Sequence, residues 1–333
     1  MANPTILDTL IVQLATETAW GTPVATQTVK LMDVLDCTFK PIAERKRLRG
    51  RRGTMAPAHN VARNRFGVEG TLKGYASYED VLYLLEGMCG IATPSGVGPY
   101  TRNYAAPAAS PVALSGGARA RFYTLFYGES GDVRRITSAL LVKLVLEFNE
   151  GEEVKYEASF LGKSKDATGT LTALSDRAVN PIYGGDVALY IDAEGGTIGS
   201  TQISNLAYSA KLTLDAMRKG RRHLGNFYPS RIAETPWEGE LDLGFEYDTT
   251  IVKAYVADLL DTTKNFSKQV RLKATNGTNI LQLDFAGTAE EPGEELGDDD
   301  GVGTYDINLK GLNNTTLGNW FKAQVVNGVA AVA

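Results

Sequence analysis

The side chains that could do chemistry in this chain are few, and they begin with two histidines. His59 and His223 each lie inside a basic segment, and neither has a nearby Cys, His or Glu at a spacing typical of a metal site. Asp298 and Asp300 could offer carboxylates to a calcium ion, but the twelve-residue pattern of an EF-hand is absent. The sequence also lacks a nucleophile elbow, a P-loop and a dinucleotide-binding fingerprint. We therefore predict no enzymatic activity, no catalytic residue, no cofactor and no bound metal.

Basic residues gather in two loops that precede similar stretches of the chain. They are Arg45, Lys46, Arg47, Arg49, Arg51 and Arg52 in the first loop and Arg218, Lys219, Arg221 and Arg222 in the second. Their recurrence favours contact with an acidic surface of another subunit. A plain solvated loop is a second interpretation. Direct contact with nucleic acid is a third, against which the lack of interleaved aromatic residues counts.

Acidic residues form two further patterns. One is the polar side of two alternating strands, which carries Glu69 in the first strand and Glu238, Glu240, Asp242 and Glu246 in the second. The other is a loop near the C-terminus with Glu290, Glu291, Glu294, Glu295, Asp298, Asp299 and Asp300. Such faces either meet solvent, pair with the basic loops or line a shared surface in an assembly.

The acidic strands belong to a unit that occurs twice. Arg65–Met88 alternates apolar and polar residues and then shows the apolar spacing of an amphipathic helix. Pro236–Leu259 repeats this plan at one constant offset, with Phe66 matching Trp237, Glu69 matching Glu240, Leu72 matching Leu243, Ser77 matching Asp248 and Val81 matching Val252. Ser77 and Asp248 are the predicted helix caps, and Gly70 marks a bulge or a close backbone approach. We interpret the match as a tandem duplication, and chance similarity between two strand-helix units is the alternative.

Composition describes an ordinary globular chain. Of the 333 residues 43% are hydrophobic and 22% charged, and the net charge of −5 argues against a protein that coats nucleic acid. No stretch is long and apolar enough for a membrane span, and no signal peptide is recognisable. Cys37 and Cys89 give no disulfide framework, so we expect two reduced, buried thiols.

The predicted organisation is an N-terminal arm (1–28), a first domain (29–165), a linker (166–185) and a second domain (186–333). We expect a mainly β protein in which each domain is a β-sandwich or open barrel with one flanking helix. Trp20 and Pro23 in the arm either cover the edge of the core or dock on a neighbouring subunit. Residues 90–118, rich in Gly, Ala, Pro and Ser, are expected to form a long functional or disordered loop.

The order of motifs resembles phage tail tube proteins of long non-contractile tails. The resemblance is clearest over residues 14–90. It is carried by Glu17-Thr18-Ala19-Trp20-Gly21-Thr22-Pro23, then Arg47, Gly53 and Pro57, then Val68-Glu69-Gly70-Thr71-Leu72 and Tyr78-Glu79-Asp80-Val81-Leu82.

The resemblance implies a structural protein of the virion tail, made in the bacterial host cytoplasm. Such proteins form stacked rings of six tube domains around a lumen, and members with a duplicated domain form trimeric rings with pseudo-sixfold symmetry. The implied partners are further copies of the chain, the tape measure protein, and tail terminator and distal tail proteins. DNA passes through the lumen without specific binding, and no membrane is involved.

The resemblance to tail tube proteins implies a place in the tube for each group of charged residues. The acidic strand faces would line the lumen, where they would repel phosphates and let DNA slide. The basic loops would contact other subunits, the arm with Trp20 and Pro23 would dock on a neighbour, and the acidic loop would lie between rings. Another virion β-sandwich, from a capsid surface or fibre, and a carbohydrate-binding β-sandwich are the alternatives.

Overall fold

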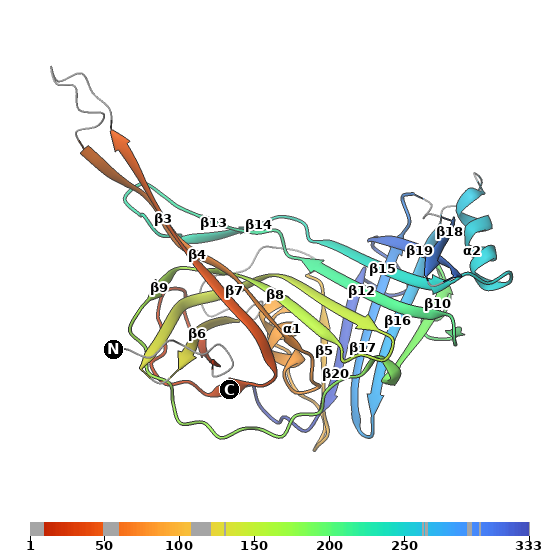
Figure 1. Cartoon of the computed structure of the whole chain (residues 1–333), viewed down its shortest axis with the longest axis horizontal. Helices are drawn as coiled ribbons and strands as arrows, with labels where there is room; N and C mark the ends of the chain where they lie inside the picture. The colour runs from red at the N-terminus through yellow and green to blue at the C-terminus, as the bar shows by residue number, and fades with distance from the viewer. Residues whose placement is uncertain are drawn as a thin grey trace.

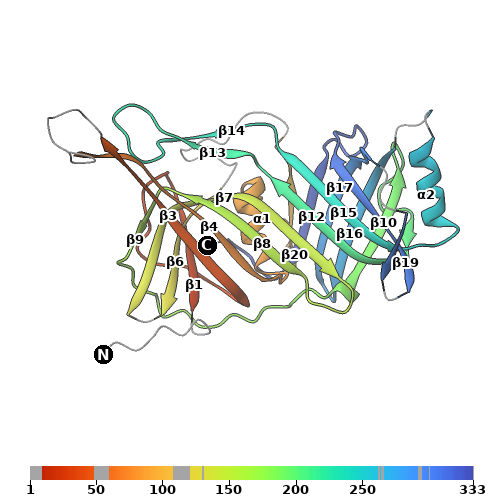
Figure 2. The same cartoon turned by 45° about the horizontal axis from the view of Figure 1, so that its top comes forward.

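The structure is a computed structural model that describes residues 10–48, 60–107, 121–129, 131–261, 263, 266–291, 295–299 and 301–332. Two β-rich halves lie side by side along the long axis, and a two-stranded arm projects from the first half (Figures 1 and 2). The predicted mainly β fold is confirmed. In the part of the chain described here, no helix has the length and apolar character needed to cross a bilayer.

The first half is a set of antiparallel strands around one helix. Its elements are β1 (Ile11–Glu17), β2 (Val29–Leu31), β3 (Val34–Leu48), β4 (Asn60–Tyr75), α1 (Val81–Cys89), β5 (Tyr100–Ala105), β6 (Phe122–Glu129), β7 (Asp132–Asn149), β8 (Lys155–Gly162) and β9 (Ser164–Asp166). The long, largely apolar strand β7 belongs to two sheet layers, because its first part pairs with β6 and its second part with β8.

The second half contains more strands and again one α-helix. Its elements are a short 3-10 turn (Gly184–Asp186), β10 (Val187–Ala193), β11 (Gln202–Ile203), β12 (Ala207–Asp215), β13 (Arg218–Arg221), β14 (Arg231–Glu234), β15 (Glu238–Glu246), α2 (Ile251–Leu260), β16 (Ser267–Asn276), β17 (Asn279–Thr288), β18 (Glu295–Asp299), β19 (Val302–Gly311) and β20 (Phe321–Asn327).

The two halves share one order of strand pairing. In the first half, neighbouring strands follow the order β2–β1–β6–β7–β8–β4–β3, and β9 also pairs with β7. In the second half the order is β11–β10–β16–β17–β19–β15–β12, and β20 also pairs with β17. Each helix follows the corresponding strand, β4 or β15, so the strand-helix unit found in the sequence occupies matching places.

Two strand pairs join the halves. Lys143–Asn149 of β7 pair with Ser209–Asp215 of β12, so one sheet continues from the first half into the second. In addition β5 pairs with β20, the edge of the second half's other sheet. The expectation of a structureless loop over 90–118 is therefore wrong at residues 100–105, where buried Arg102 and Tyr104 alternate with more exposed residues as in a strand. Residues 108–120 lie outside the described residues.

Apolar side chains of both halves form one continuous core, but the two helices are buried to very different extents. In α1 every residue from Val81 to Met88 is buried. In α2 only Val252 and Val256 are buried. Among the described residues, several segments cover α1, whereas Lys253, Ala254 and Ala257 leave one side of α2 exposed.

Several local predictions can be compared with the structure. Asp248 caps α2 as predicted, because its Oδ1 accepts the N–H groups of Ile251 at 2.8 Å and Val252 at 2.7 Å. Ser77 instead accepts the N–H of Asp80 at 3.1 Å, one turn before α1. Gly70 marks a close approach as predicted, since a Cβ there would lie 2.4 Å from the backbone oxygen of Thr38.

The basic loops are strands for part of their length, which corrects the sequence interpretation. Arg45–Leu48 extend β3 and pair with Asn60–Arg63 of β4, while Arg218–Arg221 form β13 and pair with β14. The polar composition hid this continuation, because a two-stranded arm without a buried face shows no apolar alternation. Residues 167–183, expected as a linker, lie along the first half, with Thr172 hydrogen-bonded to Gln13 and Gln27.

Candidate functional site

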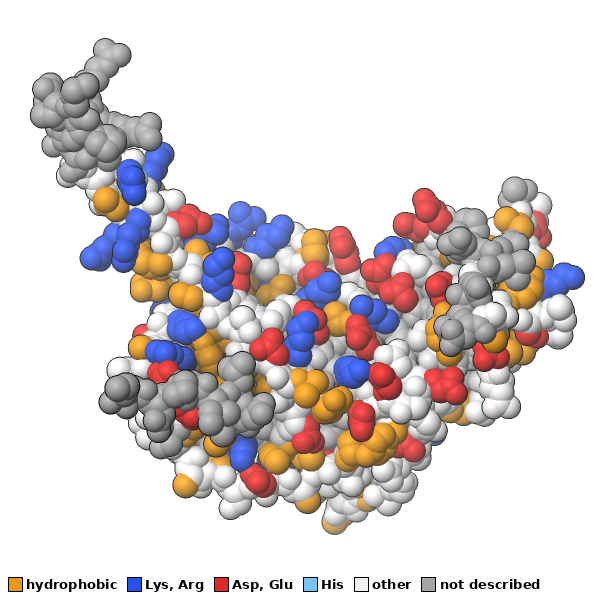
Figure 3. Space-filling model, viewed as in Figure 1, with side chains coloured by type: hydrophobic (Ala, Val, Ile, Leu, Met, Phe, Trp, Pro, Cys, Tyr) orange, Lys and Arg blue, Asp and Glu red, His pale blue; other side chains and the backbone are white. Residues whose placement is uncertain are grey.

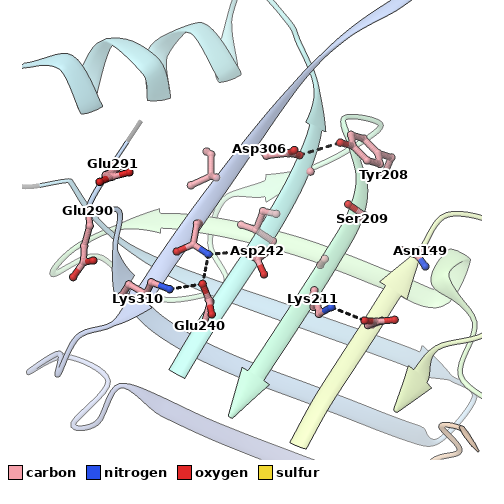
Figure 4. A pocket seen from close by; sticks show the side chains of 16 residues that line it. Asn149, Tyr208, Ser209, Lys211, Glu240, Asp242, Glu290, Glu291, Asp306 and Lys310 are labelled. Carbon is pink, nitrogen blue, oxygen red and sulfur yellow. Dashed lines mark hydrogen bonds and ion pairs between the residues drawn. The ribbon is translucent and has the colours of Figure 1, made fainter. Parts of the chain in front are cut away.

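One polar surface is the outer face of the sheet that runs through both halves. Side chains of β7, β12, β15 and β19 point from this sheet into an open hollow of about 890 Å³ (Figure 4). The strands alternate as their sequences predict, so Leu212, Leu241 and Leu243 face the core while charged residues face the hollow.

Lysines and amides partly neutralise the acidic residues of this face. Lys211 lies 2.7 Å from Glu147, and Lys310 contacts Glu240 (Figure 4). Asn308 donates to Glu240 and Asp242. The hydrogen bonds from Lys310 and then from Asn308 lower the pKa of Glu240, so they favour its charged form.

An excess of negative charge remains in the hollow. It is lined by six acidic side chains and two lysines. Four of the six come from strands, and Glu290 and Glu291 come from the segment after β17 (Figure 4). Alternation placed Glu240 and Asp242 on the acidic face, but the sequence did not predict that Glu147, Asp306, Glu290 and Glu291 would share their hollow.

The other predicted acidic residues lie in several places. Glu238 borders a smaller hollow next to the first, together with Lys143 and Asp215. Glu246 is exposed near the end of β15. Glu69 shares a separate hollow with Arg65, Arg221 and Arg222 and therefore faces a basic surface. Of the acidic loop, Glu295, Asp298 and Asp299 are in β18, while Glu294 and Asp300 lie outside the described residues.

The predicted basic residues divide between two hairpins. Arg45, Lys46 and Arg47 are exposed on the projecting arm made by the far ends of β3 and β4. Arg49, Arg51 and Arg52 lie outside the described residues. The second hairpin, β13–β14, lies over the first half (Figure 2), and blue side chains gather on this side of the molecule (Figure 3). On it, Lys219 and Arg221 are exposed, whereas Arg222 donates to the carbonyl oxygen of Phe66 at 2.8 Å.

Arg218 is a buried contact between the halves. Its guanidinium donates to the carbonyl oxygens of Gly87, Met88 and Leu141 at 3.1, 2.7 and 2.6 Å, and thereby satisfies the end of α1. Glu234 lies 3.5 Å from its Nε, and the Trp237 ring stacks against it at 5.3 Å. Burial lowers the pKa of Arg218, and Glu234 opposes that shift. No pattern in the sequence distinguishes this enclosed arginine from its neighbours.

Trp20 packs on its own chain. Its ring meets Phe122 edge to face with centroids 5.5 Å apart, and its Nε1 donates to the carbonyl oxygen of Pro229 at 3.0 Å. It therefore covers the edge of the first half's core and also holds the β13–β14 hairpin. Pro23 is exposed.

Nothing on the described residues resembles a reactive centre. No three His, Cys, Asp or Glu side chains gather there as a metal-binding group. Cys37 and Cys89 are free thiols, and burial raises the pKa of each to about 12. Both thiols are therefore protonated at neutral pH.

Comparison with known proteins agrees with a structural role. None of the curated proteins matches the sequence. The model of the phage tail tube protein family matches residues 9–311, which includes both halves and nearly the whole chain. The chain therefore belongs to the phage tail tube protein family, and it is a structural component of a virion tail.

Proposed function

We propose that this chain arose by tandem duplication of one tube domain and that it assembles with itself into rings that stack into a hollow tail tube. Three chains would close one ring, so that six similar units surround a lumen. The equal order of strand pairing in the two halves supports the duplication. The first domain would be 29–165 and the second 186–333. The N-terminal segment 1–28 would precede the first domain, and residues 166–185 would join the two.

The observation that carries the proposal is the joint between β7 and β12. It shows how one unit's sheet extends into the next, with seven residues of each strand paired. β3 is the counterpart of β12, and among the described residues its only strand partner is β4. Its other edge offers unpaired backbone groups, which a strand of a second copy would satisfy in the same way. A joint of this head-to-tail kind closes into a ring when the rotation allows it.

The polar hollow supports the assignment of the lumen. Its excess of carboxylates would repel the phosphates of DNA, and the paired lysines would moderate that repulsion, so that DNA passes without binding. The lumen-facing set would include Glu238, Glu240, Asp242 and Glu246, and the tape measure protein would occupy the same space before ejection. Tail terminator and distal tail proteins would bind the two ends of the tube.

Electron microscopy of the purified chain tests the assembly. Rings or hollow tubes are expected, and the mass of an isolated ring distinguishes three chains from six. A chain that stays monomeric at high concentration would refute the proposal. For the lumen, Asp242→Asn and Glu246→Gln should leave assembly intact and change the rate of DNA ejection, whereas loss of assembly would place these residues at an interface.

A further inference from the structure

The projecting arm and the β13–β14 hairpin occupy corresponding places in the two halves. In the arm Arg45 pairs with Arg63, and in the hairpin Arg218 pairs with Glu234. Arg63 and Glu234 are separated in the sequence by the same offset as Phe66 and Trp237. Strand pairing therefore makes Arg45 the counterpart of Arg218.

The local sequence and backbone support this correspondence. Ala43-Glu44-Arg45-Lys46 matches Ala216-Met217-Arg218-Lys219. The backbone is irregular next to each arginine: the register of β3 and β4 shifts between Glu44 and Arg45, where Asn64 is left out of the pairing, and Met217 before Arg218 has a φ of 51°. In both hairpins the irregularity therefore lies beside the matching arginine.

In the second hairpin, the arginine at this position, Arg218, covers the end of helix α1. Arg218 donates to the last carbonyls of α1, and Phe227 packs edge to face on Phe66 with ring centroids 6.1 Å apart. The contacts of Arg218 are among those that leave Val81 to Met88 of α1 buried, and the Phe227 contact holds the hairpin against β4.

Neither the arm nor α2 has such a partner surface within the described part of the chain. Arg45, Lys46, Arg47 and Arg63 are exposed, and so is Leu48 at 45% of its surface. At the opposite end of the molecule, α2 presents the partly exposed Tyr255 and Leu259 and leaves Leu260 60% exposed (Figure 1). An uncovered arm at one end and an uncovered helix at the other are the two sides of a head-to-tail contact.

We propose that the arm of one copy seats on α2 of the next copy, with Arg45 donating to the carbonyl oxygens at the end of that helix. The counterparts of Gly87 and Met88 are Asp258 and Leu259, at the offset that also relates Phe66 to Trp237. The inference rests on the proposed ring and names the contact that reinforces its sheet joint.

Charge supports this choice of partner. Arg218 has Glu234 as its cross-strand neighbour, whereas Arg45 has Arg63, so the arm lacks the carboxylate that accompanies the buried arginine. The end of α2 supplies negative charge through Asp258, which also holds Lys268 at 3.2 Å, and through Asp261. The terminal carbonyls of the helix add a partial negative charge of their own.

Crosslinking between copies tests the contact. In a chain with Arg45→Cys and Leu259→Cys, a short bismaleimide should produce covalent oligomers up to one closed ring, because the two sites lie at opposite ends of a single chain. The matched control combines Arg45→Cys with Asn276→Cys at the exposed end of β16, and it should give no ladder of covalent oligomers. Cys37 is buried, Cys89 is half-buried, and the pKa of each is raised to about 12, so the native thiols stay protonated and should react little.

The outcomes separate this inference from the proposed function. Rings that form without the crosslink between residues 45 and 259 would refute the arm contact but not the proposed assembly into a tube. A native chain that never assembles would overturn both. As a second measurement, Arg45→Met should raise the concentration needed for assembly by about tenfold or more, the scale of a lost charged hydrogen bond. Lys46→Met, on the other side of the arm, should leave the concentration needed for assembly unchanged. Equal effects of the two variants would also refute the contact.

Discussion

Replacement of Arg218 by methionine tests how strongly the two halves depend on each other. Methionine keeps an unbranched apolar stem but removes the charge, so Glu234, with only 4% of its side chain exposed, loses its cationic partner. Removal of one member of a buried ion pair costs about 3–5 kcal/mol. The carbonyls of Gly87, Met88 and Leu141 also lose their donor. Because the effects share one side chain, we expect about 3–5 kcal/mol in total rather than their sum.

The assay is urea unfolding of the unassembled chain, followed by circular dichroism and by the fluorescence of Trp237, which stacks on Arg218. Lys219→Met is the matched control, because Lys219 is exposed on the same strand, and it should change the free energy of unfolding by less than about 0.5 kcal/mol. If Arg218→Met fails to fold, Arg218→Lys, which retains the charge, should fold with a smaller loss. An Arg218→Met chain within about 1 kcal/mol of the native one would refute the reasoning.

Three further predictions concern single sites. Asp248→Ala should destabilise the chain by about 1 kcal/mol at neutral pH, because Asp248 caps α2. Its pKa is lowered by backbone hydrogen bonds, so the stabilisation is complete above the unfolded-state pKa and disappears as the pH falls through the folded-state value; a difference that persists in acid would contradict this assignment. Gly70→Ala should cost about 1–3 kcal/mol in urea unfolding, since its Cβ would lie 2.4 Å from the Phe39 ring, and an unchanged midpoint would exclude that close packing. Cys37 and Cys89 should react with a thiol reagent at pH 8 only when urea unfolds the chain, because burial raises the pKa of both to about 12.

Sequence periodicity predicted the parts of the fold in which one face is buried. The alternation around Leu72 and Leu243 and the apolar stripes at Val81 and Val252 correspond to β4, β15, α1 and α2. The match at a constant offset also placed these elements at corresponding positions in the two halves.

Contacts between distant segments could not be predicted in this way. β5 and the far ends of β3 and β4 have no long apolar pattern, because β5 pairs at the edge of the other half and the arm has two exposed faces. Likewise, one arginine in a basic segment looks like another, and only the path of the chain decides that Arg218 is enclosed while Lys219 meets solvent. The charge pairs Lys211–Glu147 and Lys310–Glu240 depend on strand neighbours that the sequence does not specify.

Each half of the chain completes part of the other, and this has a consequence for the order of folding. The end of α1 gains its hydrogen-bond donor only after Arg218 has been made, and β5 finds its strand partner only after β20 has been made. Although its two halves are built alike, the nascent chain cannot complete the first before most of the second exists. A chain that is truncated before β20 is therefore left with an open core and an unmatched strand, the features that quality-control proteases and chaperones recognise.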